Sequence, residues 1–310
     1  MIDLLPVAAV LGPGVLAGAA VLYHRHGGVK LYPQRTDFPL IRAVSALPIP
    51  DQVNLDALPV GMGQFGPWNL RLRGTHVLIA GATGAGKGSV LWSIVRACQP
   101  AVQAGLVELW GLDPKRVELA YGRGLFSEYA DTAEGCAELL EYAVEKLRGR
   151  TDAMQGLTRE HTPAAGDPHR VIFVDEVADL TAYCPDKKIR QRVSAALAVL
   201  TSQGRAPGFS VVAALQDPRK DILDIRDLFP LRIAMRLETK NQVDMALGEG
   251  AYENGARPNE IPDDPSAAGH AFVKVQGTRA PQLVRAAFVG NDDIKAMEAR
   301  YGRLRPVQAA

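Results

Sequence analysis

A glycine-rich loop near residue 85 constrains this sequence more than any other feature. The run His76–Ala80 reads HVLIA, and it is followed directly by GATGAGKGS at residues 81–89 and then by an apolar stretch. A strand, a glycine-rich loop and a helix start in this order are typical of a loop that binds phosphate groups. The glycines let backbone N–H groups turn toward phosphate oxygens, and the helix start adds the positive end of its dipole. The segment therefore predicts a site for a nucleoside triphosphate.

Nine consecutive residues of this loop are the expected nucleotide ligands. They are Gly81, Ala82, Thr83, Gly84, Ala85, Gly86, Lys87, Gly88 and Ser89. The Lys87 ammonium group can reach the β- and γ-phosphates. The next residue is ordinarily a serine or threonine that binds Mg²⁺, but here it is Gly88, and the hydroxyl follows at Ser89. One residue turns a side chain by about 100° around a helix, so Ser89 is the predicted Mg²⁺ ligand if the helix start is distorted, with Thr83 or water as alternatives.

A second motif consists of an apolar run that ends in two carboxylates. Val171–Val174 reads VIFV, and Asp175 and Glu176 follow it. A buried strand that ends here delivers Asp175 to the Mg²⁺ shell, partly through water, and Glu176 to a position from which it polarises the attacking water. Together with the loop upstream, the pair predicts phosphoryl transfer from a nucleoside triphosphate to water.

Short apolar runs alternate with helical stretches along most of the chain. They are His76–Ala80, Leu106–Leu112, Val171–Val174, Phe209–Leu215 and Leu231–Leu237, with His270–Val275 and Gln282–Val289 as closing strands. A helix is expected over Thr132–Met154, where apolar residues recur at helical spacing. Buried strands that alternate with helices indicate a mainly parallel sheet covered on both faces. The expected fold class is therefore α/β, a P-loop nucleoside triphosphatase core.

The start of the chain differs from the rest. Leu4–Tyr23 is uncharged and long enough, at about 1.5 Å per residue, to cross a hydrocarbon core of roughly 30 Å as a helix. No basic stretch precedes it, unlike a signal peptide, and basic residues follow it between positions 24 and 30. The prediction is a single-pass anchor in the cell membrane with the remainder of the chain in the cytoplasm. A buried or interfacial helix is the alternative, because the run is rich in alanine and glycine and contains Pro6 and Pro13.

These features divide the chain into four parts. We expect an anchor over residues 1–23, a proline-rich linker over 24–57, the ATPase domain over 58–294 and a tail over 295–310.

The three cysteines are far apart in the sequence, which argues against a disulfide scaffold or a zinc site. The 35 basic and 34 acidic residues leave a net charge of +1. Charge alone therefore indicates no nucleic-acid partner.

Five ordered blocks of sequence carry a resemblance to a known family. They span residues 81–92, 112–119, 171–180, 204–218 and 231–248, and the second and third read LDPKRVEL and VIFVDEVADL. They resemble the FtsK/SpoIIIE family of DNA-pumping ATPases, especially the short transfer proteins of actinobacterial conjugative plasmids and integrative elements. The GKG at residues 86–88 departs from the GKS of the wider family and is similar to these transfer proteins. The resemblance implies a RecA-like core in a hexameric ring, with ATP and Mg²⁺ between subunits and double-stranded DNA in the central hole.

The resemblance also implies roles for single residues. Gln216, at the end of the strand SVVAALQ, would sense the γ-phosphate. Arg205 of GRAPG is a candidate for reaching a phosphate of the neighbouring subunit, and an intrasubunit salt bridge is its alternative role. Two rivals of Arg205 are Arg232 and Arg236. Lys115 and Glu118 of the second block follow a strand at the nucleotide edge, where structural pairing and catalysis both stay open.

A ring changes the meaning of the small net charge. Each loop that faces DNA is presented once per subunit, so a few basic residues can neutralise many phosphates. The first candidates for DNA contact are Arg219, Lys220 and Arg226, and the second are Lys187, Lys188, Arg190 and Arg192. A solvated helix face is the alternative for both sets. Few residues follow Val289, too few for the winged-helix module of larger family members, so a separate protein is expected to supply any choice of DNA sequence.

The sequence thus favours a membrane-anchored, ATP-driven translocase of double-stranded DNA that acts in conjugative transfer between cells. Two alternatives stay open. One is a coupling or secretion ATPase that passes single-stranded DNA with its relaxase, or a protein, to a channel. The other is a membrane scaffold whose assembly depends on nucleotide, against which the acidic pair argues.

Overall fold

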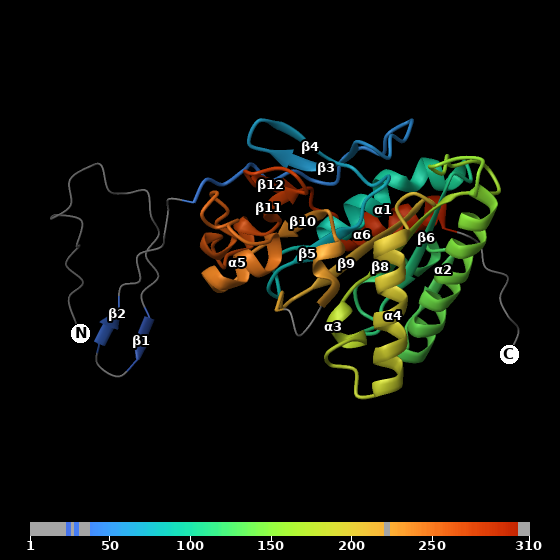
Figure 1. Cartoon of the computed structure of the whole chain (residues 1–310). Coiled ribbons are helices and arrows are strands. Elements are labelled where there is room, and N and C mark those ends of the chain that lie inside the picture. Colours follow the sequence, from blue (N-terminus) through green and yellow to red (C-terminus); the bar gives the residue numbers. More distant parts are fainter. Residues whose placement is uncertain (1–22, 26–27, 31–37, 220–223, 303–310) are drawn as a thin grey trace, which may run out of the picture. The chain divides into compact units, whose positions relative to one another are not determined.

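The computed structural model of the 310-residue chain describes residues 23–25, 28–30, 38–219 and 224–302 (Figure 1). Two compact units divide at residue 40. In the first unit, β1 (Tyr23–Arg25) and β2 (Gly28–Lys30) pair antiparallel. The expected membrane anchor lies, except for its last residue, outside the described residues. Across the described ranges, none of the helices is both long and apolar enough to span a bilayer.

The second unit is built on a ten-stranded sheet. Its strands lie in the order β4-β3-β12-β11-β10-β5-β9-β8-β6-β7. The parallel strands are β5 (Val77–Ala80), β6 (Val107–Leu112), β7 (Glu128–Ala130), β8 (His169–Val174), β9 (Phe209–Leu215) and β10 (Leu231–Ala234). The antiparallel extension beyond β10 consists of β3 (Leu58–Gly63), β4 (Gly66–Leu70), β11 (His270–Val275) and β12 (Gln282–Ala286). The expected α/β class with a mainly parallel sheet is confirmed.

The order of the parallel strands decides what meets at the edge of the sheet. β9 lies between β5 and β8, with Ala80 beside Leu215 and Val174 next to Ala213. Because the three strands are parallel, their carboxyl ends reach the same edge. The segments that follow these ends are the glycine-rich loop, Gln216 and the acidic pair, which are distant in the sequence.

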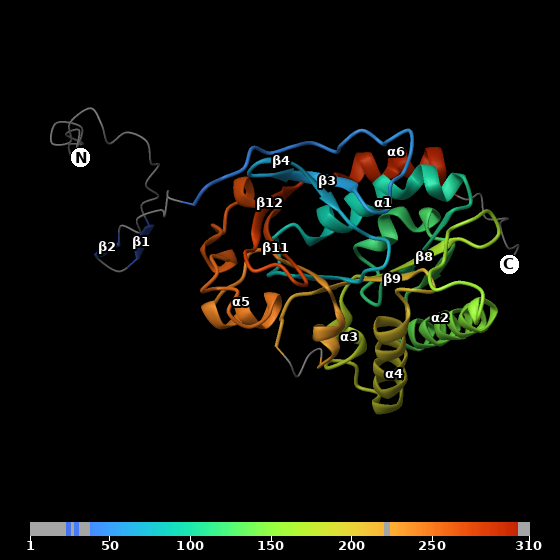
Figure 2. The same ribbon diagram turned by 45° about the horizontal axis from the view of Figure 1, so that its top comes forward.

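Helices cover both faces of this sheet (Figure 2). One face carries α1 (Lys87–Gln103) and α6 (Asn291–Tyr301), and the other carries α2 (Ala133–Met154), α3 (Val177–Leu180) and α4 (Lys187–Gln203). α5 (Lys240–Leu247) packs against β10. Polar side chains mark the helix starts: Thr132 Oγ1 accepts a hydrogen bond from the Gly135 N–H at 3.1 Å, which caps α2. α6 buries Ile294 and Met297 and so extends the compact unit into the expected tail.

The core explains why the central strands read as uninterrupted apolar runs. Every residue of β5 and of β9 is buried, because helices cover both faces of the sheet and leave no side for polar residues. The three cysteines, Cys98, Cys136 and Cys184, are buried free thiols. Their side chains are part of the interior.

The segment expected to be a linker is divided in the structure. From residue 40 onward it belongs to the second unit. The Ile41 N–H donates to His270 Nε2 at 2.8 Å, and its carbonyl accepts from Arg285 Nη1 at 2.9 Å. Further along, the Leu47 carbonyl accepts from Arg96 Nε at 2.7 Å. We call residues 40–47 the strap, because hydrogen bonds from its main-chain atoms hold this extended segment against the rest of the second unit.

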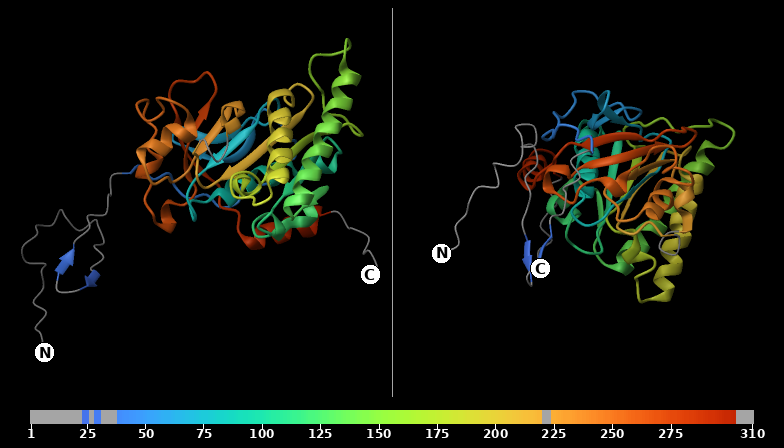
Figure 3. Two further views of the ribbon diagram at one scale, coloured as in Figure 1. Left: turned by 60° about the horizontal axis from the view of Figure 1, so that its bottom comes forward. Right: turned by 90° about the vertical axis from the view of Figure 1, so that its left-hand side faces the viewer.

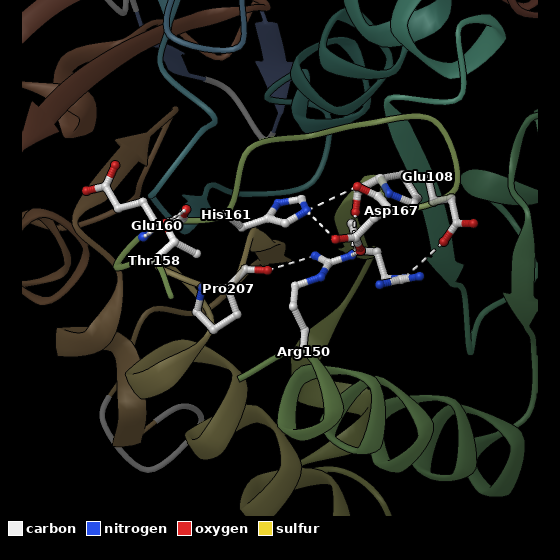
Figure 4. Close-up of polar contacts among 9 residues, drawn as sticks. Glu108, Arg150, Thr158, Glu160, His161, Asp167 and Pro207 are labelled. Atoms are coloured by element: carbon white, nitrogen blue, oxygen red, sulfur yellow. Dashed lines mark hydrogen bonds and ion pairs between the residues drawn. The ribbon is translucent and has the colours of Figure 1, made fainter. Parts of the chain in front are cut away.

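A polar cluster closes the amino edge of the sheet, opposite the glycine-rich loop (Figure 4). The Arg150 side chain, near the end of α2, is only 5% exposed and donates to the carbonyl oxygens of Pro207 at 2.7 Å and Pro168 at 2.8 Å. It also pairs with Asp167, whose carboxylate lies 3.1 Å from His161 Nε2. The cluster joins the end of α2 to the loops that lead into β8 and β9.

Arg150→Ala should lower the free energy of unfolding by about 2–4 kcal/mol, because two buried carbonyl groups and Asp167 lose their donor. Arg148, on the same helix, is exposed, so Arg148→Ala should change it by less than about 0.5 kcal/mol. Urea unfolding followed by circular dichroism measures both values. Equal losses in the two variants would contradict a structural role for this cluster.

Candidate nucleotide-binding site

The glycine-rich loop connects β5 to α1 in a conformation that requires glycine at two positions. Gly84 and Gly86 have φ values of 76° and 100°, in the left-handed region that glycine adopts without strain. Gly86 also lies so close to Gly269 that a Cβ atom would sit 2.8 Å from the Gly269 nitrogen. Gly86 directly precedes α1, so the loop lies at the positive end of the helix dipole.

The Lys87 ammonium group bends back onto its own loop. Nζ donates to the carbonyl oxygen of Gly81 at 2.7 Å and lies 3.4 Å from that of Ala82. Burial lowers the pKa of Lys87, while the carboxylates of Glu176 and Asp175 act in the opposite direction. The charge is therefore held inside the loop, where phosphate oxygens can replace the two carbonyl groups as its partners.

The structure places Glu176 at the carboxyl edge with contacts to two other elements. Its side chain is 4% exposed, and Oε1 accepts a hydrogen bond from the Gln216 N–H at 3.3 Å. Oε2 lies 3.5 Å from Lys115 Nζ, which also lies 3.6 Å from Asp179. Burial raises the pKa of Glu176, and Lys115 counteracts this effect. Lys115 thus pairs with the predicted catalytic carboxylate.

Asp175 lies among other carboxylates, and the charge of Lys115 offsets only part of their effect on its pKa. Burial and the charges of Asp113, Glu118 and Glu176 raise the pKa of Asp175 to about 7. Among the described residues, no three histidine, cysteine, aspartate or glutamate side chains converge to hold a metal ion by themselves. A cation here would complete its shell with phosphate oxygens and water, as Mg²⁺ does in nucleotide sites. The donor set fits Mg²⁺ bound together with a nucleotide, with Asp175 as one ligand.

A cleft of about 1050 Å³ connects these groups. Its lining includes loop residues 83–89, Asp175, Glu176 and Gln216, which sequence motifs indicated, and Glu118, for which the sequence left the role open. The strap contributes residues 43–45. This volume is slightly above the usual range of about 300–1,000 Å³ for small-molecule sites and suits a nucleoside triphosphate.

Two hydrogen bonds connect the loop to the strands beside it. Thr83 Oγ1 donates to Gln216 Oε1 at 3.2 Å, and Arg236 Nη2 donates to the Thr83 carbonyl at 2.8 Å. Arg236 also pairs with Asp263 at 3.0 Å. Arg236, expected as a rival for contact with a neighbouring subunit, therefore contacts the loop of its own chain. Local sequence holds no signal for this contact, because it depends on β10 lying next to β5.

The structure does not bring Arg205 to this cleft. Arg205 is exposed in the turn before β9, whereas Gln216 follows the other end of that strand. Arg232 pairs with Asp227 at 3.0 Å in its own chain. A role for Arg205 at the nucleotide of a neighbouring subunit stays a prediction.

Of the residues predicted first for DNA contact, Arg219 and Arg226 lie after β9, at the carboxyl edge. Arg219 pairs with Asp217 at 2.6 Å, and Arg226 Nη1 donates to the Pro218 carbonyl at 2.9 Å. Lys220 lies outside the described residues. η3 (Asp224–Leu228), which carries Arg226, packs against α4.

The second basic set, at the start of α4, is divided by its contacts. Arg192 pairs with Glu134 and Glu141 of α2, and these two helices lie side by side (Figure 3). Lys187 and Lys188 are exposed. Arg192 therefore joins two helices, while the two lysines are available to a partner.

The position after Lys87 is unusual in structure as well as in sequence. Glu118 covers Gly88, and a Cβ atom there would lie 2.6 Å from the Glu118 Cδ. Ser89, the predicted Mg²⁺ ligand, lies in the first turn of α1 and lines the same cleft. The sequence placed Glu118 at the nucleotide edge without a role, because its approach to Gly88 is a tertiary contact.

The parallel sheet, the preformed phosphate loop and the acidic pair define the chain as a P-loop ATPase. Residues 49–170 match the model of the FtsK/SpoIIIE family. This match covers part of the chain and shows its similarity to ATPases of the FtsK/SpoIIIE type.

Its relatives include much longer proteins. The chain is 26% identical over 292 residues to the DNA translocase FtsK of Corynebacterium efficiens, which covers 84% of this chain and 29% of that protein. It is 30% identical over 209 residues to the DNA translocase SftA of Bacillus subtilis, covering 58% and 21%. The chain thus spans less than a third of the length of either relative.

Solved structures share the fold. The pCW3 conjugation coupling protein TcpA, determined with ATPγS, superimposes with a TM-score of 0.69 at 16% identity, over 91% of this chain and 81% of that one. The cytoplasmic domain of the Type VII secretion ATPase EccC of Thermomonospora curvata gives 0.59 at 18% identity, over 84% and 32%. These similarities support a RecA-like core.

Gly86→Ala should weaken ATP binding about tenfold or more, because a side chain at this φ costs about 1–3 kcal/mol and meets the Gly269 backbone. Gly149→Ala is the control, since Gly149 lies in α2 with open space around it, and alanine favours the helix. Titration with a fluorescent ATP analogue measures both. Unchanged affinity in Gly86→Ala would show that the loop tolerates another backbone conformation.

Proposed function

We propose that this chain is an ATP-driven translocase of double-stranded DNA. One observation carries the proposal: Lys87, Glu176 and Gln216 meet in a single cleft, in a domain whose sequence relatives are named DNA translocases. The cleft supplies the groups that ATP hydrolysis needs, and the relatives indicate the work to which hydrolysis is coupled.

Hydrolysis follows from the positions of these groups. The loop N–H groups and Lys87 bind the β- and γ-phosphates. Glu176 accepts a proton from the water that attacks the γ-phosphorus, and the bond from this phosphorus to the β,γ-bridging oxygen breaks to give ADP and phosphate. Gln216 contacts Glu176 through its N–H and the loop through its side chain, so it is placed to report loss of the γ-phosphate. Mg²⁺, held by Asp175, supplies charge neutralisation at the phosphates when bound.

Translocation requires a path for DNA, and we place it at the carboxyl edge. In our proposal six copies form a ring, and the segment that carries Arg219, Lys220 and Arg226 faces the duplex. Repetition around the ring raises the positive charge that DNA meets, although the chain has a net charge of only +1. Phosphate contacts carry no sequence information, so a separate protein would choose the DNA.

We further propose that the translocase acts in conjugative transfer, held at the cell membrane by residues 1–23 with the ATPase domain on the cytoplasmic side. The fold similarity to TcpA, a conjugation coupling protein, supports this process. The fold similarity to EccC, a Type VII secretion ATPase, favours a second candidate, which is a coupling or secretion ATPase that moves a protein or a relaxase with single-stranded DNA. The two functions share the cleft and differ in what stimulates hydrolysis.

Duplex DNA should stimulate ATP hydrolysis more than single-stranded DNA does, and the stimulation should fall as salt rises, because phosphate contacts release counterions. Glu176→Gln should lower the hydrolysis rate about 100-fold or more, because it removes the proton acceptor, and it should still bind ATP. Phosphate release gives the rates, and a fluorescent ATP analogue gives the binding.

Glu138→Gln is the matched control for hydrolysis, since Glu138 is exposed on α2. Stronger stimulation by single-stranded DNA would favour the second candidate. A Glu176→Gln variant that hydrolyses ATP normally would contradict the catalytic assignment and would support a scaffold.

Lys115→Met should move the acidic limb of the pH–rate profile to higher pH. Lys115 lowers the pKa of Glu176, so its removal keeps Glu176 protonated, and unable to accept a proton, up to a higher pH. We expect a shift of about 1 pH unit. Arg116→Met is the control, because Arg116 faces Asp131 instead, at 3.9 Å. Superimposable profiles for Lys115→Met and the wild type would contradict the coupling.

A further inference from the structure

Gly88 removes a metal ligand that phosphate loops ordinarily provide. The residue after the loop lysine is expected to place a hydroxyl on Mg²⁺, and glycine has none. The space for that side chain is nevertheless filled in this structure. A Cβ atom at Gly88 would come closest to Oε1 of Glu118, and it would lie 2.6 Å from Cδ and 2.7 Å from Oε2. A carboxylate therefore occupies the space in which a side chain at position 88 would begin.

Glu118 is held there by a buried tryptophan. Its Oε1 accepts a hydrogen bond from Trp92 Nε1 at 2.8 Å, and Trp92 lies on α1, four residues after Gly88. The Trp92 residue is 1% exposed. Because this bond engages Oε1 alone, the carboxylate is oriented by one oxygen. In the described part of the chain, Oε2 takes part in no hydrogen bond.

The surroundings of Glu118 match those of the expected ion. Glu118 lines the same cleft as Lys87 and Asp175, and it reaches the loop from the block LDPKRVEL, which follows β6. Mg²⁺ in nucleotide sites is held by one or two carboxylates together with phosphate oxygens and water. Asp175 and Glu118 are two such carboxylates, and each follows a strand of the parallel sheet, β8 and β6 respectively. By contrast, Ser89 is turned by about 100° around the helix from the usual position.

We propose that Glu118 replaces the missing loop hydroxyl and, with Asp175, supplies the protein oxygens for the Mg²⁺ that accompanies ATP. The inference rests on the proposed function only in taking ATP as the ligand. A carboxylate differs from a hydroxyl in its charge, so it repels the phosphates when no Mg²⁺ is present and attracts the ion when it is. Binding of ATP to this chain therefore depends more strongly on Mg²⁺ than binding to a loop with serine does.

Glu118→Gln separates this role from a merely structural one. Glutamine keeps an acceptor for the Trp92 N–H and removes the charge. A fluorescent ATP analogue is titrated into the full chain with Mg²⁺ and with EDTA. The affinity with Mg²⁺ divided by the affinity with EDTA should fall about tenfold or more in Glu118→Gln. The melting temperature of this variant without nucleotide should stay at the wild-type value. Glu128→Gln, at an exposed position in β7, should keep the wild-type ratio.

A pair of variants tests the exchange directly. Gly88→Ser alone should bind ATP weakly, because its Cβ meets Glu118. Gly88→Ser combined with Glu118→Ala removes that clash and returns a hydroxyl, so it should bind ATP with Mg²⁺ better than either single variant. Binding of Mn²⁺ in the presence of ATP, followed by electron paramagnetic resonance, should rank the variants in the same order.

Two results would overturn the proposal. One is an unchanged ratio of affinities in Glu118→Gln, and the other is a double variant that binds Mn²⁺ with ATP no better than the single variants. These measurements need neither DNA nor hydrolysis. A chain that shows the expected Mg²⁺ dependence but no stimulation by DNA would contradict the proposed translocase and leave the assignment of Glu118 standing, whereas a wild-type chain that binds no ATP would overturn both.

Discussion

The function of this chain depends on one constraint, which is the parallel pairing of β5, β9 and β8. Pairing in register places Ala80 beside Leu215 and Val174 next to Ala213, so the three strands end at one edge. The phosphate loop, Gln216 and Glu176 follow these ends. A shift of β9 along its neighbours would break the hydrogen bond from Gln216 to Glu176 and the contact from Thr83 to Gln216. The register of these strands therefore sets the positions of the site residues relative to one another.

The two edges of the sheet carry different kinds of polar group. At the amino edge, Arg150 and Asp167 are paired with each other and with backbone carbonyls, and they stabilise the ends of α2, β8 and β9. At the carboxyl edge, Asp175 and Glu118 form no ion pair with a described residue, although Lys87 and Lys115 line the same cleft. Burial of unpaired charge is costly, so this edge gains stability when a nucleotide and its cation bind.

The strap connects the cleft to the start of the chain. Residues 43–45 line the cleft, while Ile41 is held by His270 of β11 and Arg285 of β12. The antiparallel part of the sheet thus binds a segment that composition alone assigns to a linker. Isolated prolines and charges without periodicity are equally compatible with a free extended segment and with one bound to the domain. The sequence does not distinguish the two, because the hydrogen bonds that hold this segment are made by its main-chain atoms.

The local elements could be predicted from the residues alone: the loop at residues 81–89, the strand that leads to Asp175 and the parallel class of the sheet. Each depends on neighbours in the chain, through glycine conformation or runs of buried residues. Three features required the folded chain: Arg236 contacts the loop of its own chain, Arg205 lies at the far edge, and Glu118 covers Gly88. These contacts join segments that only strand order brings together, and no local pattern of residues encodes them.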